Sequence, residues 1–143
     1  MYWILAILAI GLIIFVHELG HYIVGKRKGI PIAVFSVGFG PRLFGFRRGG
    51  TDHRISLIPL GGYVMPRLKK VEDLHRIPVN RRVAFSLGGP LANIVFAVLL
   101  LSIYNSIISG PSFMNIFVLP VIQCGSFMIS MVASFAALFT DPG

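Results

Sequence analysis

The sequence YWILAILAIGLIIFVHELGHYIVG, residues 2–25, decides the fold. It contains no Lys, Arg or Asp, and its two histidines and one glutamate lie in its second half. As a helix it would extend about 36 Å, which exceeds the roughly 30 Å hydrocarbon core of a bilayer. A secretory signal peptide fits poorly, because basic residues follow the apolar run instead of preceding it. The stretch therefore predicts a helix that spans a membrane.

The composition agrees with a membrane protein. Hydrophobic residues make up 55% of the 143 residues and charged residues only 13%, too few for the surface of a soluble domain. The net charge of +8 would suit a nucleic-acid binder, yet all 13 Lys and Arg lie between Lys26 and Arg82. This crowding follows the positive-inside rule and argues against a nucleic-acid partner. We expect the N-terminus outside and the basic loop 26–82 in the cytoplasm, where it either contacts anionic lipid or is simply solvated.

The basic loop holds a segment with the character of β-structure. Residues 30–64 are rich in proline, glycine and β-branched residues, and polar and apolar residues alternate at 54–58. A turn signal at 47–52 separates two short strands. We expect a β-hairpin or small sheet that contacts the membrane, where pairing satisfies its backbone. Residues 65–82 form a polar connector.

Two further apolar stretches follow the connector. Residues 83–108 and 113–140 are each long enough to span a bilayer. In the second stretch, Pro120 and Gly125 could instead divide the helix into two shorter pieces. The predicted fold class is therefore membrane α-helical, a single domain over 1–143 with three transmembrane helices. A membrane-associated β-hairpin on the cytoplasmic side lies between the first and second helices, and the first helix covers 2–25.

The motif His17-Glu18-Leu19-Gly20-His21 carries the chemistry. Residues four apart project from one helix face, so both imidazoles can reach one zinc ion while Glu18 approaches its bound water. The alternative is a packed pair of neutral histidines with Glu18 protonated or paired. An ionised side chain near the bilayer centre costs roughly 2.5 to 3.5 kcal/mol, which disfavours an idle set. Since His17 lies nine residues before Lys26, a polar cavity must open toward the cytoplasm.

Small and polar residues recur at two other places. Gly20 either thins the helix face between the histidines or serves ordinary close packing of helices. The second place is Gly88-Gly89-Pro90-Leu91-Ala92-Asn93, in which Pro90 frees a backbone carbonyl and small residues permit helix contact. Taken alone, Asn93 fits a packing hydrogen bond better than a catalytic role.

Four motifs in this order resemble the site-2 protease family of intramembrane metalloproteases. They are HELGH at 17–21, FSVGFGP at 35–41, IPLGGYV at 58–64 and GGPLAN at 88–93, and the resemblance runs from about residue 8 to residue 100. The chain looks most like the bacterial branch that releases membrane-tethered regulators such as anti-sigma factors. This resemblance implies an integral protein of the bacterial inner membrane, with transmembrane proteins as substrates.

The resemblance also implies residue roles. His17 and His21 would bind Zn2+, and Glu18 would be the general base. Residues 32–64 would match the family's membrane-reentrant β-region, which positions an extended substrate.

The family's G-P-x-x-N pattern is matched as well. Gly89, Pro90 and Asn93 would lie beside the active site and hold substrate, as the resemblance implies.

The sequence departs from the family in its third zinc ligand, an aspartate in an L-D-G motif. No L-D-G occurs here, and the neighbours of the remaining candidate, Asp141, do not match. We therefore expect a truncated chain that binds zinc weakly and is inactive alone. The alternative function is a non-catalytic relative that binds partner helices. A haem or metal-transport bundle is disfavoured, because two histidines on one helix cannot sandwich a porphyrin.

Overall fold

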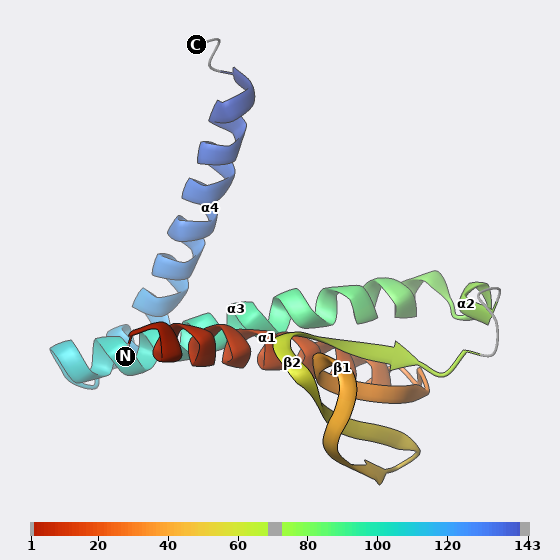
Figure 1. The fold of residues 1–143 in the computed structure, drawn as a ribbon. Coiled ribbons are helices and arrows are strands. Elements are labelled where there is room, and N and C mark those ends of the chain that lie inside the picture. Colours follow the sequence, from red (N-terminus) through yellow and green to blue (C-terminus); the bar gives the residue numbers. More distant parts are fainter. Residues whose placement is uncertain (1, 69–72, 141–143) are drawn as a thin grey trace. The chain divides into compact units, whose positions relative to one another are not determined.

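The computed structural model describes residues 2–68 and 73–140. The chain divides into two compact units, Met1–Asn93 and Ile94–Gly143, which are described separately below. In chain order the elements are α1 (Tyr2–Arg27), β1 (Ile32–Arg48), β2 (Thr51–Pro66), α2 (Asp73–Arg76), α3 (Val79–Ser109), a π-helical turn (Met114–Val118) and α4 (Leu119–Thr140) (Figure 1).

Three helical segments of the described chain are long and apolar enough to cross a membrane. They are Tyr2–Arg27, Val79–Ser109 and Met114–Phe139. This finding confirms the predicted set of three long apolar helices with a small sheet between the first two. The second helix begins at Val79 and so takes in part of the expected connector 65–82. Its first turn is anchored by Pro78, whose carbonyl accepts bonds from the backbone N–H groups of Arg81 and Arg82.

The sheet consists of two long antiparallel strands joined by a two-residue turn. Gly49 and Gly50 form the turn with φ of 55° and 78°, a conformation that suits glycine at both positions of a tight hairpin. The register beyond the turn pairs Arg48 with Thr51 and Phe46 with His53. The β-structure expected over 30–64 is present from Ile32 to Pro66, but the expected short strands are wrong: β1 has 17 residues and β2 has 16.

Both strands bend, so the sheet folds back on itself. Residues 34–37 of β1 pair with 62–65 and also with 52–55, which places the first half of β1 between the two halves of β2. Glycines with positive φ occupy the bends, namely Gly38 (92°), Gly40 (85°) and Gly61 (125°). The segment 62–66 of β2 consequently lies at one edge of the sheet.

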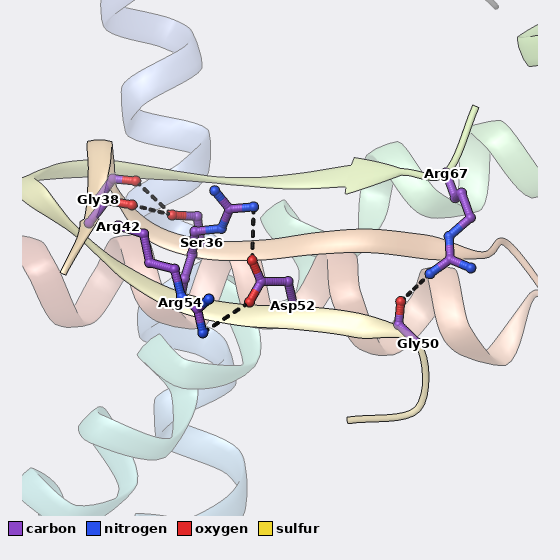
Figure 2. Close-up of polar contacts among 8 residues, drawn as sticks. Ser36, Gly38, Arg42, Gly50, Asp52, Arg54 and Arg67 are labelled. Carbon is purple, nitrogen blue, oxygen red and sulfur yellow. Dashed lines mark hydrogen bonds and ion pairs between the residues drawn. The ribbon is translucent and has the colours of Figure 1, made fainter. Parts of the chain in front are cut away.

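Polar side chains hold the interior of the sheet together (Figure 2). The Ser36 hydroxyl is fully buried, donates to the Gly38 carbonyl at 3.0 Å and lies 2.9 Å from the Ser56 hydroxyl. Asp52 lies 3.0 Å from the guanidinium of Arg54 and 3.5 Å from that of Arg42. These contacts pair most of the polar groups that the bent strands bury, while Asp52 Oδ1 and Arg54 Nε make no hydrogen bond.

Aromatic side chains pack α1 against the sheet. The ring of Phe15 meets that of Phe35 edge to face with centroids 6.2 Å apart, and Tyr22 lies 5.3 Å from the same ring. Next to this cluster is an apolar pocket of about 380 Å3, lined by Phe15, Phe35, Val37, Phe44, Phe46, His53, Arg54 and Ile55. The sheet is therefore fixed to the second half of α1, where the zinc motif lies.

In the second unit, the π-helical turn Met114–Val118 leads directly into α4 at Leu119, so one helical segment, Met114–Phe139, runs past Pro120. Proline has no N–H, so the carbonyl of Ile116 loses its usual helical donor. The Ser102 hydroxyl of α3 donates to that carbonyl at 2.7 Å instead. The division considered at Pro120 and Gly125 therefore does not occur.

Candidate active site

The two histidines of the zinc motif meet on one face of α1. Their Nε2 atoms lie 3.1 Å apart, and the ring centroids are 4.8 Å apart. Two nitrogen ligands of a tetrahedral zinc ion, each at 2.0–2.1 Å, would be about 3.3 Å apart. His17 and His21 are therefore already at the separation that a shared metal ion requires.

Hydrogen bonds orient both rings from behind. His21 Nδ1 lies 2.7 Å from the Phe85 carbonyl, which can only accept, so Nδ1 carries the proton and Nε2 keeps its lone pair. His17 Nε2 then donates to His21 Nε2, and His17 Nδ1 accepts from the Asn93 amide nitrogen at 3.2 Å. A chain of hydrogen bonds thus runs from Asn93 through both imidazoles to the Phe85 carbonyl.

The space in front of the two Nε2 atoms is kept open by Gly89 of α3. A Cβ atom at this position would lie 2.6 Å from Nε2 of His17 and closer still to Nε2 of His21. The two nitrogens therefore face a place where residue 89 puts no atom. Paired imidazole nitrogens at this separation, with no side chain of residue 89 between them and α3, fit a zinc ion.

Close contact of α1 and α3 makes this arrangement possible. A Cβ on Gly20 would touch the Gly88 carbonyl and lie 2.5 Å from Cβ of Ala92, and a Cβ on Gly88 would lie 2.8 Å from the Gly20 carbonyl oxygen. The backbones can approach this closely only because both residues are glycine. Of the two interpretations of Gly20, the structure favours close helix packing.

The side chain of Glu18 extends from α1 toward the sheet. A Cβ on Gly62 of β2 would be 2.7 Å from Cγ of Glu18, so the carboxylate side chain rests against the edge segment. It shares a pocket of about 280 Å3 with a histidine and an asparagine of the motifs. The pocket is lined by Ile13, Ile14, His17, Glu18, Phe39, Gly61, Gly62 and Asn93.

Most of the predicted site residues come together here. His17, Glu18, His21, Gly89 and Asn93 surround one region of the first unit. Pro90 is exposed and is not among the residues that line the pocket, which separates it from its neighbours in the motif.

A third zinc ligand is not found in the described part of the chain. Among the side chains that the structure describes, no group of three or more His, Cys, Asp or Glu is placed to hold a metal ion. Asp141, the candidate left by the sequence, lies outside the described residues.

Two features of the site were not predicted from the sequence. The Phe85 carbonyl has no sequence signal, because any residue supplies one. Gly62 had a signal in its place within IPLGGYV, but only the fold puts it against Glu18.

Comparison with known proteins gives a consistent result. The model of the family described as Peptidase family M50 matches residues 5–142. The chain is 44% identical over 119 residues to a Chlamydia pneumoniae protein named "Putative zinc metalloprotease". The alignment covers 71% of this chain and 19% of that protein.

Similarly named proteins of other bacteria also match. The identity is 37% over 129 residues with one from Agrobacterium fabrum, covering 73% of this chain and 34% of the relative. With a protein of the same kind of name from Helicobacter pylori, the identity is 38% over 109 residues, and the alignment covers 68% of this chain and 31% of the relative. The chain spans about a fifth to a third of the length of these relatives. The resemblance to site-2 proteases is confirmed: the chain belongs to peptidase family M50, a family of membrane-embedded zinc metalloproteases.

Proposed function

We propose that this chain provides the zinc-binding helix and substrate-facing sheet of an intramembrane endopeptidase that cleaves transmembrane segments of membrane-tethered regulators. The observation that carries the proposal is the pair of Nε2 atoms 3.1 Å apart on an apolar helix, with Glu18 lining the adjoining pocket. The relatives named as zinc metalloproteases favour this function over a non-catalytic protein that only binds partner helices.

In this proposal the histidines of the motif bind the metal ion and its glutamate transfers protons. His17 and His21 hold the metal ion, and their rings are kept in place by Asn93 and the Phe85 carbonyl. A bound zinc ion lowers the pKa of its water to about 7 and polarises the scissile carbonyl. Glu18 accepts the proton of the attacking water and passes it to the leaving amine.

The edge of the sheet would receive the substrate. A helical transmembrane segment must unwind before its peptide bond can react, and its exposed backbone then needs hydrogen-bond partners. Residues 62–66 pair with β1 on one side, and Gly62 lies against Glu18. The other side of this edge would pair with the unwound segment by strand addition.

The proposed orientation has the N-terminus outside the bacterial inner membrane and the loop 26–82 in the cytoplasm. The distribution of the 13 basic residues supports it. A cysteine introduced at the hairpin turn by Arg48→Cys should react with an impermeant thiol reagent in inverted vesicles and be protected in intact spheroplasts. The opposite pattern would reverse the topology.

The decisive experiment is Glu18→Gln in the full-length protein, assayed for cleavage of a transmembrane reporter. General-base catalysis contributes about 10²- to 10⁴-fold, so cleavage should fall by at least 10²-fold. Zinc content, measured alongside, should remain, since Glu18 is not proposed as a ligand. Undiminished cleavage rejects the role of Glu18, and zinc content unaffected by His17→Ala with His21→Ala rejects the metal site.

A further inference from the structure

We propose that Gly89 and Asn93 build the seat of the metal ion, instead of holding the substrate as their motif suggests. Gly89 keeps the metal position clear, and Asn93 fixes the proton and orientation of the His17 ring. This inference rests on the proposed function and deepens it. It gives Gly89 and Asn93 a part in metal binding, for which only the two histidines were expected.

The role of Gly89 follows from the position of its absent side chain. A Cβ there would lie 2.6 Å from Nε2 of His17 and nearer to Nε2 of His21, only about 0.5 Å beyond the 2.0–2.1 Å at which a zinc ion would stand from them. Any residue larger than glycine therefore competes with the ion for the same space. Gly89 is buried, so a methyl group cannot turn away into solvent.

The role of Asn93 follows from the hydrogen-bond chain. In the structure its amide nitrogen faces Nδ1 of His17 at 3.2 Å, while its Oδ1 is buried without a hydrogen-bond partner. When Nε2 gives its lone pair to a metal ion, the proton of a neutral imidazole moves to Nδ1, which must then donate. A half-turn of the Asn93 amide brings Oδ1 to Nδ1 and supplies the acceptor.

The Asn93 side chain can thus bond to His17 both in the absence and in the presence of a metal ion. Without metal the amide N–H2 donates to His17, and with metal the amide oxygen accepts from it. Neither a purely donating nor an apolar side chain could do both. This places Asn93 as a positioning residue that acts through His17, with no contact to the ion itself.

The test is the zinc affinity of the full-length protein, measured by competition with a chromophoric chelator for three variants. Asn93→Leu matches the size of asparagine but accepts no hydrogen bond, and partners of metal-binding histidines are worth about 10- to 100-fold in affinity. We expect the dissociation constant to rise by that factor. Asn93→Asp restores an acceptor for the Nδ1 proton, so its affinity should equal or exceed that of the wild type.

Gly89→Ala tests the second half of the seat. We expect it to lower zinc affinity by at least 100-fold, whereas Gly11→Ala, the same change in a helix with nothing within 4 Å, should leave it unchanged. Helix content by circular dichroism and the unfolding midpoint in detergent show whether each variant still folds. The Asn93 pair keeps the test valid if Gly89→Ala does not fold.

The outcomes separate the two proposals. If the wild type binds zinc through the histidines and both Asn93→Leu and Gly89→Ala bind it equally well, the seat is refuted while the proposed function stands. If Asn93→Leu and Asn93→Asp lose affinity alike, Asn93 acts only through packing and its assigned role is wrong. If the wild type binds no more zinc than the double histidine variant, both proposals fail.

Discussion

Replacing Gly20 by alanine should push α1 and α3 apart at their closest point. The added methyl group would touch the Gly88 carbonyl and lie 2.5 Å from Cβ of Ala92. Carbon atoms in contact prefer about 3.5–4.0 Å, so the helices must separate by about 1 Å. Neither obstacle can rotate aside, because one is backbone and the other is a Cβ.

The same separation of the helices would disturb the hydrogen bond that orients the His21 ring. A separation of about 1 Å would lengthen the 2.7 Å contact between His21 Nδ1 and the Phe85 carbonyl to about 3.7 Å, beyond hydrogen-bond range. Overpacking of this kind costs about 1–3 kcal/mol of unfolding free energy. Removing a glycine from a helix returns about 0.5–1 kcal/mol, and Gly11→Ala gains this term without the clash.

Comparing the two alanine variants cancels that common gain. We expect Gly20→Ala to be less stable than Gly11→Ala by about 1–3 kcal/mol, measured by reversible unfolding in mixed micelles. Zinc affinity should fall with it, since the His21 ring loses its acceptor. Equal stabilities and equal zinc affinities for the two variants would refute the close packing of Gly20 against α3.

The remaining predictions concern other buried contacts. Ser36→Ala leaves the hydroxyl of Ser56 without its partner inside the sheet and should cost about 1–3 kcal/mol of unfolding free energy, with little further loss in the double alanine variant. Asn105→Leu breaks the 3.0 Å bond to Gln123 and should destabilise the second unit by about 0.6–2 kcal/mol, which steric-trapping or micelle unfolding would detect. Gly62→Ala should displace the proposed general base and lower reporter cleavage in the full-length protein, while zinc content stays unchanged.

The sequence predicted the helices and the zinc motif because both depend on local spacing. A helix that spans a membrane needs only enough consecutive apolar residues, and two histidines four apart share a helix face wherever the helix packs. The β-region was found from its composition, but the double pairing of residues 34–37 was not. That pairing depends on bends at glycines and on contacts between distant parts of the chain.

Long-range hydrogen bonds account for the rest. Pro120 signalled a break, yet a hydroxyl from α3 bonds the carbonyl that proline leaves free. Asn93 was ambiguous in the sequence because its partner, His17, lies 76 residues away. The carbonyl of Phe85 belongs to the backbone, so no residue type could have pointed to it.

The glycine turn at residues 49 and 50 constrains how the length of this protein can change. Register in a hairpin is set by its turn, and slipping one strand by a single residue moves every side chain to the opposite face. Phe44 and Phe46 would then leave the apolar pocket that they line with His53. A single residue inserted within β1 or β2 should therefore be poorly tolerated, whereas residues added between Gly49 and Gly50 should lengthen the loop and leave the register unchanged.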